Sequence, residues 1–94
     1  MSFLNKWLWR RLLRKGQLID ALAIGNNTIV MVGDSGAISI STNDGHTWYP
    51  KNSGTSNTLI GIFFINNNFI AFGDFDTILI STNGGHTWNS ASRQ

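Results

Sequence analysis

The 94 residues of this chain suit one small domain, and the absence of cysteine excludes disulfides, thiolate metal ligands and cysteine nucleophiles. The formal net charge of +2 hides an asymmetry, because the first sixteen residues carry five of the cations whereas all five acidic side chains follow them. A basic head on a mildly acidic body predicts two segments with different roles, residues 1–16 and residues 17–94.

Residues 2–15 are predicted to form a short amphipathic helix. Ser2 is a candidate N-cap, the apolar residues that follow have helical spacing, and Gly16 is a natural stop. We expect this helix to pack on a protein partner or to lie on an anionic membrane surface, and binding of nucleic acid is disfavoured. The side chains expected to make these contacts are Lys6, Trp7, Trp9, Arg10, Arg11, Arg14 and Lys15.

The same segment does not have the pattern of a cleavable signal peptide. Its apolar run is broken by Arg10 and Arg11, and no small-residue cleavage site follows. It is also too short and too charged to span a bilayer. Together with the lack of cysteine, this predicts a cytoplasmic protein, with peripheral membrane association as an option.

After Gly16 the pattern changes to short strands separated by turns rich in Gly and Asn. The alternation predicts an all-β body of two four-stranded antiparallel units, the first at about 18–54 and the second at about 58–94. A polar bridge over residues 51–57 joins them. The expected strands are 18–24, 29–32, 37–41 and one beginning at Thr47, then 59–65, 69–72, 77–81 and 87–89.

An internal duplication relates these two units. The segment Ser41-Thr-Asn-Asp-Gly-His-Thr-Trp48 returns forty residues later as Ser81-Thr-Asn-Gly-Gly-His-Thr-Trp88, and residues 19–54 align on 59–94 without a gap. A fixed period near forty residues with strand-like content predicts a repeat array such as a β-propeller, in which each unit is one blade.

The duplicated motif falls at the hairpin between the third and fourth strands of each unit. Its asparagine is expected to bond its own backbone two residues on, and its glycine to adopt a left-handed conformation. Its serine is expected to bond locally, and its tryptophan to fold back over the turn and bury aromatic surface. The candidate residues are Ser41, Asn43, Gly45 and Trp48 in the first copy and Ser81, Asn83, Gly85 and Trp88 in the second.

The motif Ser-x-Asn-x-Gly-x-Thr-Trp closely resembles the Asp-box, or bacterial neuraminidase repeat, whose pattern is Ser-x-Asp-x-Gly-x-x-Trp. That family includes β-propellers such as sialidases, sortilin-type receptors and photosystem II assembly factors, and phage and bacterial propellers. The resemblance covers residues 18–94 and implies two propeller blades with a structural role for the motif. Because both copies have Asn where the family prefers Asp, a calcium role for this loop is not expected.

The catalytic residues of sialidase-type chemistry are missing. The chain has no glutamate, and three of its four arginines, Arg10, Arg11 and Arg14, lie in the head. We therefore expect no enzymatic activity, no catalytic residues and no cofactor. His46 and His86 occupy the same loop position in successive units and are expected to be exposed rather than to share a metal. Asp34 and Asp74 are expected to cap turns.

Two blades are too few to close a propeller, which takes about four to eight. The expected function is therefore that of a non-enzymatic scaffold or interaction protein whose blades assemble with other copies. Three chains would supply six blades and four would supply eight. Other interpretations remain open: a complementing subunit that supplies the missing blades, a piece of a longer gene, a glycan-binding (lectin-like) module, or an assembly factor docked on a membrane complex.

Overall fold

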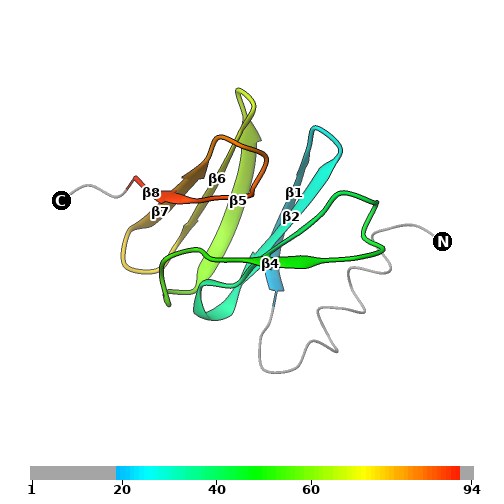
Figure 1. Ribbon diagram of the computed structural model, residues 1–94. Helices are drawn as coiled ribbons and strands as arrows, with labels where there is room; N and C mark the ends of the chain where they lie inside the picture. Colours follow the sequence, from blue (N-terminus) through cyan, green and yellow to red (C-terminus); the bar gives the residue numbers. More distant parts are fainter. Residues whose placement is uncertain (1–18, 92–94) are drawn as a thin grey trace.

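The computed structural model describes residues 19–91, which form two four-stranded antiparallel sheets and one short 3-10 turn (Figure 1). Each sheet follows the order of the chain, as a meander. Sheet A contains β1 (Ile19–Gly25), β2 (Thr28–Gly33), β3 (Ile38–Ser41) and β4 (Tyr49–Lys51), with the 3-10 turn η1 (Asp34–Gly36) before β3. Sheet B contains β5 (Leu59–Ile65), β6 (Asn68–Gly73), β7 (Thr77–Ser81) and β8 (Asn89–Ser90).

The all-β body of two four-stranded units is thus confirmed. The helix predicted over residues 2–15 lies outside the described residues. Within the part of the chain that is described, no helix is long and apolar enough to cross a membrane.

Two-residue turns fix the register of the first hairpin in each sheet. Asn26 and Asn27 have φ of 50° and 62°, and Asn66 and Asn67 have φ of 51° and 65°. Consecutive positive φ angles make the type of turn that matches the twist of paired strands, and Asn is among the side chains that tolerate them best. The asparagine pairs therefore encode both hairpins locally.

The fourth strand of each sheet begins later than the alternation predicts, at Tyr49 and Asn89 rather than at Thr47 and Thr87. The backbone N–H of Thr47 donates to a side-chain oxygen at 2.9 Å, and that of Thr87 does so at 3.0 Å. An N–H that is used by a side chain cannot also join a strand ladder, so the ladder starts two residues on.

Because side chains alternate along a strand, each sheet has two faces, and one face of each is pressed against the other sheet. We call these two surfaces the joined faces. They form the core, with β1 and β5 adjacent (Figure 1). The joined face of sheet A consists of Ala21, Ala23, Val30, Val32, Ile38 and Ile40, and that of sheet B consists of Ile62, Phe64, Phe69, Ala71 and Leu79.

Near the hairpin tips the joined faces fit because a glycine of sheet A lies opposite a phenylalanine of sheet B. Gly25 lies directly against the ring of Phe64, and a Cβ at Gly25 would overlap that ring. At the hairpin tips, the Asn26 side chain donates to Asn67 Oδ1 at 3.4 Å. The contact between the sheets therefore runs from an apolar centre to a polar tip.

The opposite surfaces are named here for use below. The open face of sheet B carries Phe63, Ile65, Ile70, Phe72, Ile78 and Ile80. The far face of sheet A carries Leu22, Ile24, Ile29, Met31, Ser39 and Ser41.

Candidate functional site

The first copy of the duplicated motif is closed by a buried serine. Ser41 is 0% exposed. Its Oγ accepts hydrogen bonds from the backbone N–H of Asn43 at 3.3 Å and of Gly45 at 2.8 Å, and it donates to Asn43 Oδ1 at 2.9 Å. One hydroxyl thus satisfies two backbone donors of the loop, which would otherwise lack partners.

Asn43 spans the loop, but not as the sequence analysis expected. Its Oδ1 accepts from the backbone N–H of Thr47 at 2.9 Å, and its Nδ2 donates to Thr47 Oγ1 at 2.8 Å. The asparagine therefore bonds four residues on, not two. The backbone N–H of Gly45, two residues after Asn43, donates to Ser41 Oγ instead.

Two successive residues with left-handed backbone conformation form the turn that these hydrogen bonds close. Asp44 has φ of 63° and Gly45 has φ of 87°. This conformation is strained for most side chains and free for glycine. The predicted fold-back of the tryptophan is present, since Trp48 Nε1 donates to Gly45 O at 2.9 Å.

The second copy repeats the arrangement. Ser81 is 0% exposed, donates to Asn83 Oδ1 at 3.0 Å and accepts from Gly85 N at 2.8 Å. Asn83 joins Thr87 through its Oδ1 at 3.0 Å and its Nδ2 at 2.8 Å. Trp88 Nε1 donates to Gly85 O at 2.8 Å. In both copies the serine, the asparagine and the tryptophan therefore bond within their own hairpin.

The second hairpin also touches sheet A. A Cβ at Gly85 would stand 3.1 Å from Ile40 Cγ2 and 3.3 Å from Val30 Cγ2. Trp88 is 8% exposed, and its ring centroid lies 6.5 Å from that of Phe69. The motif of sheet B is therefore part of the joint between the sheets.

The ionisable side chains singled out in the sequence lie on turns. His46 and His86 are exposed, and His46 Nδ1 lies 2.7 Å from Asn43 O. The carbonyls of Asp34 and Asp74 accept from the N–H of residues three positions on, at 3.0 and 3.2 Å, and so close their turns. Among the described residues no three His, Cys, Asp or Glu side chains gather as a metal site would require.

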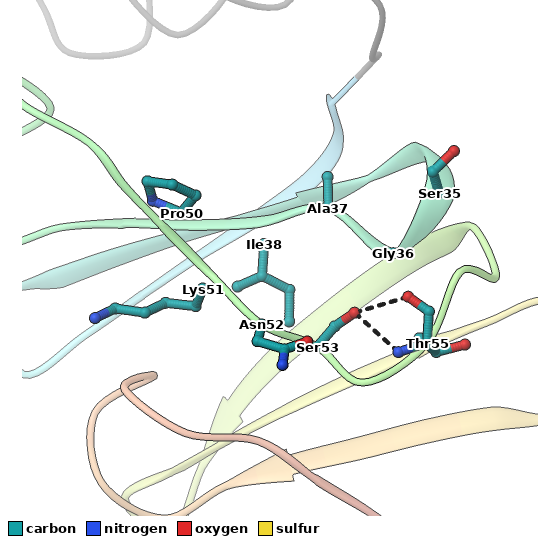
Figure 2. A pocket seen from close by; sticks show the side chains of 9 residues that line it. All are labelled: Ser35, Gly36, Ala37, Ile38, Pro50, Lys51, Asn52, Ser53 and Thr55. Carbon is teal, nitrogen blue, oxygen red and sulfur yellow. Dashed lines mark hydrogen bonds between the residues drawn. The ribbon is translucent and has the colours of Figure 1, made fainter.

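One hollow of about 270 Å³ lies between η1 and the segment after β4 (Figure 2). Lys51 is the ionisable residue among those that line it, and Figure 2 shows its side chain reaching away from Ser53 and Thr55. Ser53 Oγ donates to Thr55 O at 3.0 Å and accepts from Thr55 N at 3.3 Å. The Ser53 hydroxyl, which lines this hollow, is therefore used by the local turn.

A second hollow of about 370 Å³ lies between residues 53–57 and the β7–β8 hairpin. Two groups at its wall that would suit a sugar, the Trp88 ring and the Asn57 amide, are used within the fold, whereas the ring of Phe75 at the same wall is 87% exposed. Trp88 is buried against Phe69 rather than presented to solvent. Asn57 Nδ2 donates to Thr77 Oγ1 at 2.9 Å.

The open face of sheet B exposes large apolar side chains that no part of the described chain covers. Phe63 and Ile65 are 56% and 54% exposed, and Ile78 is 39% exposed. The rings of Phe63 and Phe72 stack with centroids 5.4 Å apart. The remaining members, Ile70, Phe72 and Ile80, are half-buried. A contiguous apolar sheet face of this kind is a candidate interaction surface.

The far face of sheet A differs from the open face of sheet B. Ile29, Met31 and Ser39 are 4%, 0% and 1% exposed, whereas Ile24 at the hairpin end is 57% exposed. The candidate contacts of the basic head, Lys6, Trp7, Trp9, Arg10, Arg11, Arg14 and Lys15, lie outside the described residues.

Comparison with known proteins gives no match to a family model, to a curated protein or to a solved structure. The resemblance to the Asp-box family therefore stays a prediction from the motif.

Proposed function

We propose that this chain is a non-enzymatic interaction protein that contributes two blades to a β-propeller completed by further copies of itself. One observation carries the proposal. The open face of sheet B is the counterpart, forty residues on, of the face that sheet A buries against sheet B. Val30 corresponds to Ile70, and Ile40 corresponds to Ile80. The same surface is thus covered in one unit and uncovered in the next.

Covering the open face would be favourable. Burial of apolar surface contributes about 25 cal/mol per Å², or about 1.5–3 kcal/mol for a large side chain moved fully out of water. Phe63, Ile65 and Ile78 still have a third or more of their surface to bury. A copy that continues the stack of sheets supplies an apolar surface of the same kind.

The number of copies follows from closure. Propellers close with about four to eight blades, and whole chains of two blades give even numbers only. Three copies would make six blades and four would make eight. The proposal includes no enzymatic activity. The serine and asparagine side chains of the motif, its main polar candidates, bond within their own hairpins.

Native mass spectrometry and light scattering on the full chain at micromolar concentration test the proposal. We expect a trimer or a tetramer. Phe63→Asp should reduce the mass to that of a monomer, because it places a charge on the open face. Tyr49→Asp is the matched control, since Tyr49 is 55% exposed but belongs to the edge strand β4.

A folded wild-type monomer under these conditions would refute the proposal. Oligomers that survive Phe63→Asp, or that both substitutions weaken equally, would show that the open face is not the joint. A larger particle that forms only with another protein would instead favour a complementing subunit.

A further inference from the structure

We infer that copies of the chain join head to tail: the open face of sheet B receives the far face of sheet A of the next copy. In this register Ile65 meets Ile24 of the next copy, and Asn66 meets Asn27 of the next copy. The inference rests on the proposed function, and it names the partner surface and the alignment that the proposed function leaves open.

The contact at the hairpin tips inside the chain supplies the template. Gly25 lies against Phe64, and Asn26 donates to Asn67 at 3.4 Å. In the alignment of the two repeats, Gly25 and Asn26 correspond to Ile65 and Asn66 on sheet B. Phe64 and Asn67 correspond in the same way to Ile24 and Asn27 on sheet A.

All four of these counterparts are accessible. Ile24 is 57% exposed and Ile65 is 54% exposed, and Asn27 and Asn66 are exposed as well. Asn27 and Asn66 also share the left-handed backbone of the pair that bonds within the chain, with φ of 62° and 51°. Each chain therefore displays both halves of a contact that it already makes once internally.

The open face of sheet B is larger than the surface to which it corresponds. Phe63 stands where sheet A has Ala23, and Ile65 stands where it has Gly25. Phe72 likewise replaces a valine. A surface enlarged in this way does not fit a copy of Phe64 as Gly25 does, so it needs a partner with smaller side chains.

The far face of sheet A has those smaller side chains. Ile24 stands where sheet B has Phe64, Ile29 where it has Phe69, and Ser39 where it has Leu79; these three reductions oppose the enlargements on the open face. Met31 in place of Ala71 runs the other way, and a flexible methionine adapts to irregular gaps. The two surfaces have thus changed size in opposite senses, as close packing between them requires.

A face-to-face pairing of two open faces fits less well. It would set the enlarged residues Phe63 and Phe72 against their own counterparts, large against large, and it would leave Ile24 exposed. A head-to-tail joint uses unlike surfaces, and it closes into a ring when the rotation between copies allows.

The order of events follows from burial on the far face. Ile29, Met31 and Ser39 are buried within the single chain, whereas the tip residues Ile24 and Asn27 are exposed. Ile24 and Asn27 at the tip are therefore the accessible part of the far face, where the first contact between copies forms.

Cysteine substitution tests the register cleanly, because the natural chain has no thiol. Full chains carrying Ile24→Cys, Ile65→Cys or both are treated with a short bismaleimide and separated by mass under denaturing conditions. We expect the double variant to give multiples of the monomer mass and each single variant to stay monomeric. Gly25→Cys combined with Phe64→Cys is the internal control, and it should crosslink within the chain without a change in oligomeric mass.

The outcomes separate this inference from the proposed function. Dimers formed by Ile65→Cys alone would indicate face-to-face pairing and overturn the inference, while leaving an oligomer in place. Oligomers in native mass spectrometry with no crosslink in the double variant would show that the register is wrong. A chain that is monomeric in both experiments would overturn the inference and the proposed function together.

Discussion

Replacing Gly85 by alanine tests whether the second hairpin presses on sheet A. Gly85 has φ of 91°, and an added Cβ would stand 3.1 Å from Ile40 Cγ2 and 3.3 Å from Val30 Cγ2. A left-handed conformation disfavours an L-residue by about 1–2 kcal/mol, and crowding of a packed contact costs about 1–3 kcal/mol more. We therefore expect Gly85→Ala to lower the free energy of unfolding by about 2–5 kcal/mol, the sum of the two terms.

Gly84→Ala is the matched control. Gly84 has φ of 78°, but the atom nearest to an added Cβ is His86 Cδ2 at 3.8 Å. The control carries the backbone strain without the crowding, so its expected loss is about 1–2 kcal/mol. The excess loss in Gly85→Ala measures the contact with Ile40 and Val30.

Urea unfolding followed by tryptophan fluorescence measures both variants. The protein concentration is held fixed, because association stabilises the folded chain by mass action. Midpoints are compared at a common slope, since a changed slope would report a change in exposed surface rather than in stability alone. If both variants unfold at the same midpoint, Gly85 does not touch sheet A and the joint between the sheets is described wrongly.

Three further predictions concern a buried hydroxyl, a strained turn and the basic head. Ser81→Ala should lower the free energy of unfolding in urea by about 1–3 kcal/mol, because it removes the acceptor of a buried backbone N–H. Thr82→Ala, at the exposed neighbouring residue, should change it by less than about 0.5 kcal/mol, and equal losses in the two variants would contradict this. Phe75 is 87% exposed with φ of 60°, so Phe75→Asn should raise the free energy of unfolding by about 1 kcal/mol, and a lower midpoint would refute the strain. If the head binds anionic membranes, the full chain should float with phosphatidylserine vesicles, and Trp7→Ser with Trp9→Ser should reduce the floating fraction; equal flotation would remove the membrane role.

Local features of the fold could be predicted because their causes are local. The asparagine pairs at the first hairpin of each sheet specify a turn through their own backbone preference. The two copies of the motif also fall between the third and fourth strands of their sheets, as the strand pattern predicts. The sequence pattern did not predict the partner of Asn43. Ser41 and Asn43 can both accept from the backbone N–H of Gly45, and in the folded loop Ser41 accepts it while Asn43 accepts from Thr47.

The choice of buried face could not be predicted, for a different physical reason. β2 and β6 are apolar on both sides, so alternation does not distinguish the surface of Val30 from that of Met31, or Phe69 from Ile70. The decision is made by the fit between sheets that are distant in sequence, as where Gly25 makes room for Phe64. Periodicity measures how apolar a face is, but it contains no information on which other face matches its shape.

In the proposed ring, the joint within the chain and the joint between copies would differ chemically, because side chains on the two outer faces differ in size from their counterparts at the inner joint. The joint within the chain sets Gly25 against Phe64, and the proposed joint between copies would set Ile65 against Ile24 of the next copy. Substitutions should therefore separate into two classes. Gly85→Ala weakens the joint within the chain, so its effect on stability should be present at every protein concentration. Phe63→Asp acts on the joint between copies, so its effect should vanish on dilution, where wild type and variant are both monomers. Titrating protein concentration against unfolding midpoint for these two variants would show whether the ring has two kinds of joint or one.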